Sequence, residues 1–242
     1  YPVAGIGYQA TPWLRLGAAY RGGVQPITDL SIDIEGDIGA AMRDPIVADA
    51  AVNLRSISLS HFQPAEFSLG AEAWLRETFV VVADLSLHRW SGFANPAAQL
   101  ESALELGQFN EFLTPPEPSS LAPANYHDIL IPRVGVEWRA LHRRHTTLHT
   151  RAGYSYEPSP APEQIGITNF VDNDKHTASL GLGLSLRDWT KIFLEPLSLD
   201  LSFAATQLAR RNHQKLSPVD PVGDYHSDGT VWQLGVTSRL RF

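Results

Sequence analysis

The stretch from His176 to Arg187 reads HTASLGLGLSLR and alternates between apolar residues and small or polar ones. From Ala178 onward the even-numbered positions are alanine or leucine, and the odd-numbered positions are serine, glycine or arginine. Successive side chains of a β-strand point to opposite faces, so a strand here has one apolar face and one small or charged face. A helix would scatter the leucines around its axis. The stretch therefore predicts a strand.

The same two-residue period recurs along the chain and predicts an all-β fold. We expect nine strands, at about 2–10, 13–35, 53–75, 79–90, 128–140, 146–156, 176–187, 193–208 and 229–242. Two of them are long and contain strand-breaking residues, a Gly-Gly pair at 22–23 with Pro26 in one and Pro64 in the other. We interpret these as interruptions within a strand; a hairpin turn at Pro64 is the competing interpretation. A short helix is predicted for 96–107, with Leu100, Ala103 and Leu104 on one face.

Either face of such strands could be the inner one. A soluble sandwich or barrel buries its apolar face in a core, whereas a membrane barrel turns it toward lipid and keeps polar residues inside. The polar face mixes Gly and Ser with Arg, Asp, Glu and His, as a hydrated or ion-paired interior would. A soluble surface would carry many lysines, but the sequence has only Lys175, Lys191 and Lys215. The pattern therefore favours a transmembrane antiparallel β-barrel over the soluble alternative.

The composition of the 242 residues excludes several other classes of protein. A net charge of −7 implies no general attraction to nucleic acid. The sequence contains no cysteine, and hence no disulfide, thiolate metal site or cysteine nucleophile. The sequence contains no run of about 18 apolar residues, so it predicts no membrane-spanning helix. No nucleophile motif stands out, and His142 and His145 suit a solvated turn better than a metal site, so we expect neither enzymatic activity nor a metal or cofactor.

The lengths of the connections indicate how the barrel is oriented. They are short after the first, third, fifth and seventh strands and long after the others, as in a bacterial outer-membrane barrel with periplasmic turns and external loops. Such barrels have an even number of strands, so nine strands predict that residues 1–242 are the C-terminal part of a larger barrel. The terminal Phe242 resembles the signal that the bacterial barrel-assembly machinery recognises. Outer-membrane lipid and lipopolysaccharide are further expected partners.

Four segments resemble the FadL family of outer-membrane transporters for long-chain fatty acids and other hydrophobic compounds. They are WLRLGAAYR (13–21), FQPAEFSLG (62–70), ADLSLHRWSGF (83–93) and RAGYSYEPSPAP (151–162). The resemblance implies a fourteen-stranded barrel whose N-terminal residues plug the lumen as a hatch. The nine expected strands match the C-terminal portion of that barrel, and the hatch and the first strands lie outside this sequence.

The resemblance also implies a function that needs no chemistry on the substrate. A hydrophobic compound would be captured on an external groove, pass to a pocket in the lumen and leave sideways into the bilayer. A different class of function is a scaffold or docking subunit of an outer-membrane secretion or surface-assembly complex, with the proline-rich loop 114–123 as the partner surface. A soluble β-sandwich without a membrane role is the third alternative.

The long connection 36–50 offers a candidate capture surface. Its apolar residues Ile38, Met42, Ile46 and Val47 would contact a hydrophobic ligand. The alternative is that they pack the loop onto its neighbours.

Cationic side chains on the predicted lumen face are candidates for holding a carboxylate. Arg133, Arg151 and His149 lie on that face of adjacent expected strands, and a fatty-acid headgroup would need one such cation. His127 stands at the mouth of the barrel and is another candidate. The competing interpretation is an ion-pair network in which these cations neutralise acidic residues of the same face. Those acidic residues are Asp84, Glu137 and Asp200.

Overall fold

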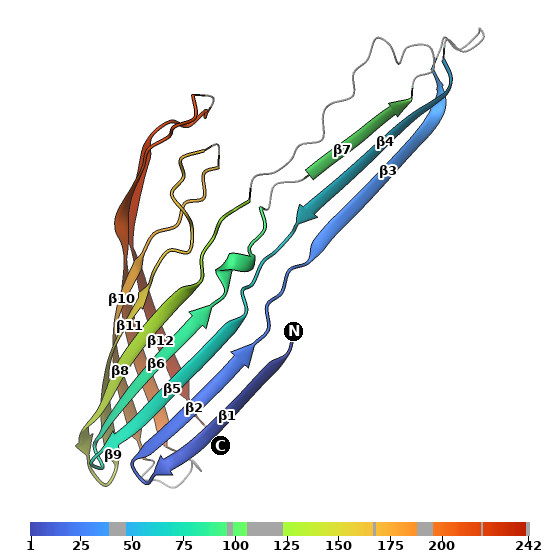
Figure 1. Ribbon diagram of the computed structural model, residues 1–242. Helices are drawn as coiled ribbons and strands as arrows, with labels where there is room; N and C mark the ends of the chain where they lie inside the picture. Colours follow the sequence, from blue (N-terminus) through green and yellow to red (C-terminus); the bar gives the residue numbers. More distant parts are fainter. Residues whose placement is uncertain are drawn as a thin grey trace. The chain divides into compact units, whose positions relative to one another are not determined.

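A computed structural model describes residues 1–38, 47–95, 99–105, 123–166, 168–187, 196–218 and 220–240 (Figure 1). The chain divides into two compact units. The first comprises Tyr1–Gly22, Pro64–Ser91 and Asn125–Phe242, and the second comprises Gly23–Gln63 and Gly92–Ala124. Within the described ranges, no helix is both long enough and apolar enough to cross a membrane.

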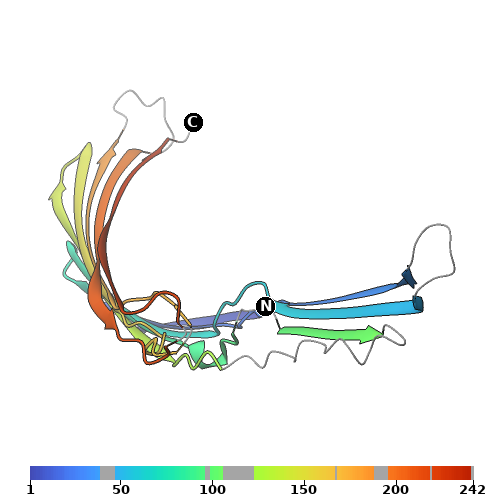
Figure 2. The same cartoon turned by 90° about the horizontal axis from the view of Figure 1, so that it is seen from above.

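The first unit contains one antiparallel sheet of nine strands. Their order in the sheet, β1-β2-β5-β6-β8-β9-β10-β11-β12, follows the order of the chain. The strands are β1 (Val3–Thr11), β2 (Leu14–Arg21), β5 (Glu66–Leu75), β6 (Phe79–His88), β8 (Ile129–His142), β9 (Thr146–Glu157), β10 (Lys175–Leu186), β11 (Leu197–His213) and β12 (Tyr225–Arg239), with a short 3-10 helix, η1 (Trp90–Gly92), after β6. The sheet is curved (Figure 2), and in the part of the chain that is described β1 pairs only with β2 and β12 only with β11. Each of the nine strands predicted from the two-residue period contributes one strand to this sheet, in the predicted order.

The two longest expected strands are each divided by an interruption. β2 is followed by β3 (Ile27–Ile38), and β4 (Val47–Leu59) is followed by β5. At the interruptions, Val24 and Gln63 form an isolated bridge. β4 pairs with β3 and β7, whereas β5 pairs with β2 and β6. Pro64 therefore marks an interruption, and the alternative of a hairpin turn there is wrong.

The second unit is a three-stranded antiparallel sheet in the order β3-β4-β7. Its third strand, β7 (Gln99–Glu105), overturns the helix predicted for 96–107. Leucines four residues apart share one face of a helix, but they also share one face of a strand, because four is a multiple of two. Backbone pairing with β4, from Ile57 opposite Gln99 to Ala51 opposite Glu105, selects the strand.

The leucines of the nine-stranded sheet do not meet in a dry core. Leu180 and Leu182 keep 62% and 50% of their surface exposed, and Leu234 keeps 74%. The buried apolar residues among those described are Ala124, Ile129, Ile131 and Ala161. A soluble chain of this length would bury a far larger apolar core. The soluble β-sandwich is therefore wrong.

Exposed aromatic residues flank the apolar face at both ends of the strands. Trp13 and Trp138 lie near the short turns, and Phe67 contacts Tyr20 next to the long connection between β2 and β5, with ring centroids 4.7 Å apart. Aromatic girdles of this kind mark the two interfaces of a membrane barrel. The apolar face is therefore the lipid-facing one, and we call the opposite face the inner face. The end of the strands that carries the long connections is called the long-connection end.

Candidate functional site

The inner face of the nine-stranded sheet is hollowed over most of its strands. The cavity, which we call the hollow, has a volume of about 810 Å³ and is lined from β5, β6 and the five strands β8 to β12. Trp74, Val80 and Val82 form an apolar wall, and small residues of the later strands form the floor. A molecule bound here would meet apolar side chains on one side and exposed backbone on the other.

Glycine residues keep the floor of the hollow free of side chains. Gly153 of β9 lies between Gly135 of β8 and Ser179 of β10 in the strand register. A Cβ atom at Gly153 would lie 2.8 Å from Ser179 Oγ, and one at Gly235 would lie 2.6 Å from Ser202 Oγ. A larger side chain at either glycine must therefore displace its neighbour or enter the hollow.

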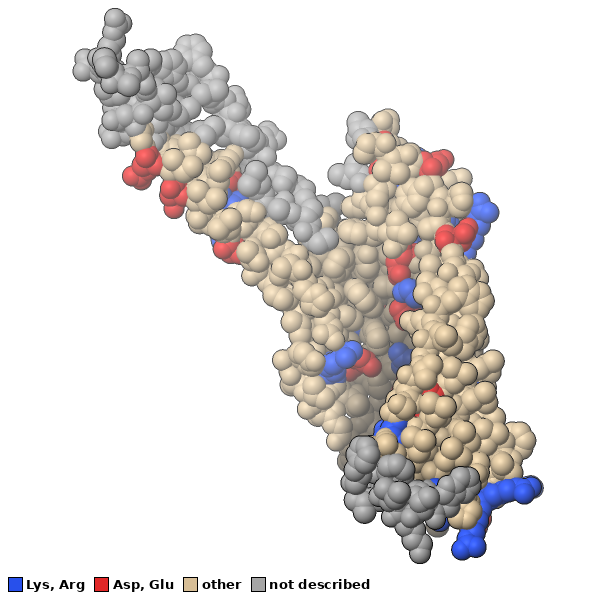
Figure 3. Space-filling model, turned by 180° about the vertical axis from the view of Figure 1, so that it is seen from behind, with Lys and Arg blue, Asp and Glu red and all other residues tan. Residues whose placement is uncertain are grey.

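Charged side chains of the inner face form two clusters, and opposite charges are paired in both. In the first cluster, Arg133 Nη1 lies 2.6 Å from Asp84 Oδ1 and donates to Ser86 Oγ at 2.8 Å. Arg21 pairs with Glu66 on the neighbouring strands β2 and β5. On the face drawn in Figure 3, several basic and acidic residues lie beside one another, and most of the described surface is neither.

The second cluster is centred on Arg151. Its Nε lies 2.6 Å from Glu137 Oε2, and its Nη1 lies 2.7 Å from Asp200 Oδ1. His149 Nδ1 lies 3.0 Å from the other oxygen of Glu137. Arg151 reaches across β10 to Asp200 because Gly183, which stands between them, has no side chain; a Cβ atom there would lie 3.2 Å from Arg151 Nη1.

The cations expected on the lumen face lie on the inner face, and they form the ion pairs that were the competing interpretation. Arg133 and Arg151 each donate to at least one carboxylate, and His149 contacts one. Their roles as ligand-binding residues stay predictions. His127 is exposed and belongs to neither cluster; its backbone N–H donates to Pro160 O at 3.0 Å.

The expected capture residues belong to the second unit. Ile38 and Val47 lie opposite each other at the end of the β3–β4 hairpin. Met42 and Ile46 lie outside the described residues. Phe242, expected to carry the assembly signal, also lies outside them. These predictions stay untested.

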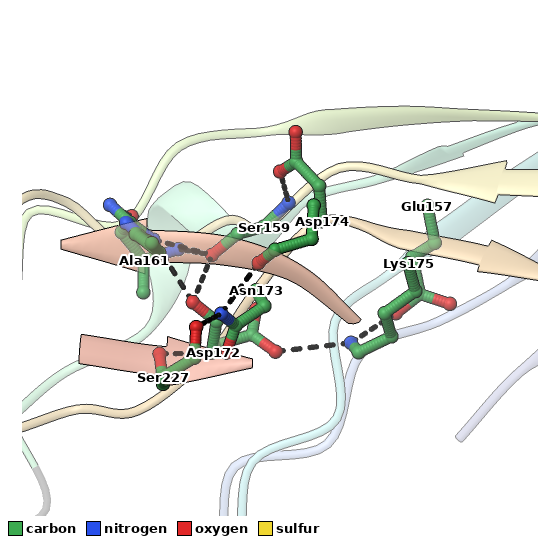
Figure 4. A network of polar contacts seen from close by, with 10 residues as sticks. Glu157, Ser159, Ala161, Asp172, Asn173, Asp174, Lys175 and Ser227 are labelled. Carbon is green, nitrogen blue, oxygen red and sulfur yellow. Dashed lines mark hydrogen bonds and ion pairs between the residues drawn. The ribbon is translucent and has the colours of Figure 1, made fainter. Parts of the chain in front are cut away.

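A third polar cluster was not predicted from the sequence. It joins the connection between β9 and β10 to the ends of β11 and β12 (Figure 4). Asn173 Nδ2 donates to the carbonyls of Ala209 and Ser227, both at 2.8 Å, and Ser227 Oγ donates back to Asn173 Oδ1 at 3.0 Å. The register of β11 with β12 shifts between Leu208 and Arg211. The side-chain amide of Asn173 therefore makes its hydrogen bonds to backbone groups next to an irregular part of the β-ladder.

Further bonds fasten the base of the same connection. The backbone N–H of Ser159 donates to Asp174 Oδ1 at 2.8 Å. Lys175 Nζ lies 2.8 Å from Glu157 and 3.1 Å from Asp172. The sequence signals were the Ser-Pro-x-Pro segment and the polar end of β11, but neither indicates that the two segments meet.

Outside the strands, Asp128 ties the start of β8 to the end of β6. The backbone N–H of Ser91 donates to Asp128 Oδ1 at 2.8 Å, and this bond holds the pKa of the Asp128 carboxyl below its usual value, with help from Arg89 at 3.7 Å. The contact lies at the long-connection end of the sheet.

Comparisons with known proteins give a consistent result. The profile of the family described as "Outer membrane protein transport protein (OMPP1/FadL/TodX)" matches residues 3–242. No curated protein sequence matches the chain significantly. A Pseudomonas aeruginosa FadL homologue of known structure is 13% identical with a TM-score of 0.51, and the match covers 98% of this chain and 65% of that one.

Two solved toluene transporters are similar to the chain as well. TodX of Pseudomonas putida is 18% identical, with a TM-score of 0.49 and coverage of 98% of this chain and 48% of that one. TbuX of Ralstonia pickettii is 19% identical, with a TM-score of 0.47 and coverage of 99% and 47%. The chain thus spans from about half to two thirds of the length of these structures.

Proposed function

The chain belongs to the outer membrane protein transport protein (OMPP1/FadL/TodX) family, and on that premise we propose that it takes up hydrophobic small molecules through the hollow of its inner face. The family is one of transport proteins rather than enzymes, and the chain is located in the outer membrane of Gram-negative bacteria. The uptake is passive, because moving an apolar solute past a polar surface layer requires binding sites and a path but no reaction.

The single observation that carries the proposal is the hollow itself. Its apolar wall of Trp74, Val80 and Val82 removes apolar surface of a ligand from water, which stabilises binding by about 25 cal/mol per Å² buried. A volume of about 810 Å³ lies within the range of small-molecule pockets. Such a pocket holds a compact hydrophobic molecule with room to enter and leave.

The charges around the hollow favour neutral ligands over fatty-acid anions. Arg151 is already shared by Glu137 and Asp200, and Arg133 is paired with Asp84. A carboxylate headgroup would have to compete with these side chains, because acidic groups lie beside both arginines. Binding of a long-chain fatty acid through Arg133, Arg151 or His149 is the runner-up within the same proposal.

The remaining steps of uptake are part of the proposal. Capture would take place on apolar residues of the β3–β4 connection, among them Ile38, Met42, Ile46 and Val47, and release would be sideways into outer-membrane lipid. Lipopolysaccharide surrounds the external side, and Phe242 would serve recognition by the barrel-assembly machinery. A docking role draws on the loop 114–123, of which only Pro123 is described, so no specific observation favours it.

A test fills the hollow and measures binding. Gly153→Val adds a branched side chain to the floor, where a Cβ atom already meets Ser179, and we expect at least a tenfold loss of affinity for naphthalene. Gly17→Val of β2 is the matched control, because a Cβ atom there meets nothing nearer than Ile6 O at 3.9 Å and Gly17 does not line the hollow. Binding is measured by naphthalene fluorescence with the full-length protein in lipid nanodiscs. Equal affinity of both variants and the parent protein would contradict the proposal.

A second measurement separates the two ligand classes. The neutral model predicts that laurate competes poorly with naphthalene and that Arg151→Met leaves naphthalene binding unchanged. Strong competition by laurate that disappears in Arg151→Met would instead establish the fatty-acid alternative.

A further inference from the structure

The register shift in β11 turns two further side chains of that strand toward the inner face. Before the shift, even-numbered residues of β11 such as Asp200 face inward, and Leu208 lies opposite Gly229. After it, Arg211 lies opposite Ser227 and His213 lies opposite Tyr225, so the odd-numbered residues of β11 face inward. A one-residue shift in a strand exchanges its two faces.

Arg211 then holds the connection between β9 and β10 by hydrogen bonds, and we call these bonds, together with those of Lys215 to the same segment, the grip. Its Nη1 donates to Ser159 Oγ at 2.8 Å and to Asp172 O at 3.1 Å, and its Nη2 donates to Ala161 O at 2.8 Å. These acceptors lie at the two ends of the connection. One guanidinium, with its five N–H donors in a planar fork, therefore closes the base of the segment.

Lys215 grips the same segment nearer its tip. Its Nζ donates to Gly166 O at 2.9 Å and to Thr168 O at 2.7 Å, and it lies 3.3 Å from Asp220. The side chains of Lys215 and Asp220 are only 3% and 1% exposed. A buried ammonium needs such partners, so its place is fixed by the folded connection.

The gripped segment covers the inner face at the long-connection end. We call residues 158–166 and 168–174 the cap. Cap residues Ala161, Gln164 and Asn173 are buried, and Pro160 O accepts the His127 N–H immediately before β8. The two inward-facing isoleucines at that end of β8, Ile129 and Ile131, are 3% and 1% exposed.

We propose that the cap is a size filter at the outer mouth of the barrel, with Arg211 and Lys215 as the positioning residues that hold it in place. This rests on the proposed uptake through the hollow. Long connections are external in outer-membrane barrels, so a solute that has been captured outside meets the cap before it reaches the hollow. Along β8, the hollow begins at Gly135, four residues or about 13 Å beyond Ile131.

The chemistry of the grip explains why the cap filters by size. Apart from Asp220, the groups that accept hydrogen bonds from Arg211 and Lys215 are backbone carbonyls and one hydroxyl. These acceptors belong to the folded connection, and a charged ligand does not displace them. The cap therefore keeps its position whether or not a solute is present. A fixed segment across a path limits the cross-section of what passes and leaves the affinity of the hollow unchanged.

The test removes the grip and measures association rates for two ligands of different size. Full-length protein carrying Arg211→Met and Lys215→Met is compared with the parent in nanodiscs, using naphthalene and the larger pyrene in stopped-flow fluorescence. We expect pyrene association to quicken about tenfold, with naphthalene association and both dissociation constants changed less than about twofold. The Gly153→Val variant supplies the background from partition into lipid.

Arg210→Met is the matched control, because Arg210 is the exposed neighbour of Arg211 on the same strand. Hydrogen exchange of residues 159–174 should quicken in the double variant and stay unchanged in the control. Should the double variant fail to give the heat-modifiable band of a folded barrel, Arg211→Lys is used, because it keeps the charge but cannot reach three separate acceptors.

Each outcome of these experiments either supports or overturns one part of the proposal. Faster exchange with an unchanged ratio of pyrene to naphthalene rates would overturn the size filter. Unchanged exchange would overturn the role of the two cations. If the parent binds neither ligand above the Gly153→Val background, the proposed uptake fails, whereas the exchange measurement still tests the grip on its own.

Discussion

Arg151, in the middle of the inner face, donates to two carboxylates, whereas Arg211, at the long-connection end, donates to two backbone carbonyls and a hydroxyl. Both are arginines that face inward from neighbouring parts of one sheet. The first neutralises charge on fixed strands and leaves the hollow open beside it. The second, Arg211, restrains a segment that is not itself paired in the sheet. The difference in acceptors separates a residue that shapes the electrostatics of the site from one that positions the chain.

The largest effect we expect is the release of the cap by Arg211→Met. Three charge-assisted hydrogen bonds are lost while the side-chain volume is nearly kept, so the protection of residues 159–174 against hydrogen exchange should fall about thirtyfold. Mass spectrometry of the exchanged protein measures it. A change spread evenly over all strands would show instead that Arg211 stabilises the whole sheet.

Arg151→Met should act without releasing any segment. It leaves Glu137 and Asp200 facing each other without their shared cation, and because all three side chains are more than a third exposed, the loss in unfolding free energy should be about 1 kcal/mol. Urea unfolding followed by tryptophan fluorescence measures the loss. Adding Asp200→Asn should restore most of it, and failure to do so would argue against charge repulsion as the cause.

Acidification should loosen the tip of the cap before its base. Although burial opposes ionisation of Asp220, the N–H groups of Gly223 and Val222 and the ammonium of Lys215 together hold the pKa of its carboxyl below the usual value. A lowered pKa means that this contribution is present above about pH 4 and lost as the pH falls through the folded value. Between about pH 5 and pH 3, the protection of amides around residue 166, measured against the intrinsic exchange rate at each pH, should fall more than that around residue 172.

Asp220→Asn should abolish that pH dependence, and Glu163→Gln, at an exposed acidic residue of the cap, should preserve it. Equal pH dependence in both variants would assign the effect to other carboxyls.

The smallest effect is expected for Asp128→Asn. The amide still accepts the Ser91 N–H and loses only the charge that faces Arg89 at 3.7 Å. Exchange at the start of β8 should change less than about twofold. A larger change would mean that this contact, rather than the cap, orders the long-connection end.

The strands were predictable because the two-residue period is a local property of the sequence. Leu180, Leu182 and Leu184 reveal the lipid-facing side without knowledge of any partner strand. The pairing of Arg133 with Asp84 followed from the same parity, since both residues fall on the inner side of strands that proved adjacent. The helix prediction for the segment 99–105 was wrong because the spacing of its leucines fits both the helical period and the two-residue period of a strand. Only its pairing with β4 selects the strand.

The cap could not be predicted, because its contacts join residues far apart in the sequence. Arg211 lies about fifty residues from Ser159 and Ala161, and it faces them only because the register of β11 shifts after Leu208. Before that shift the alternation would place Arg211 on the lipid-facing side. In the sequence, a bulge is visible only as the point where the two-residue alternation of apolar side chains stops.

The orientation of the two faces is most directly tested by site-directed spin labelling along β10. The sequence contains no cysteine, so single cysteines at Ser179, Leu180, Leu182, Leu184 and Ser185 carry one label each. In nanodiscs, labels at the three leucines should be accessible to oxygen dissolved in lipid, and labels at the two serines to a water-soluble nickel complex. The reverse assignment, or no alternation at all, would contradict the orientation on which the hollow and the cap both depend.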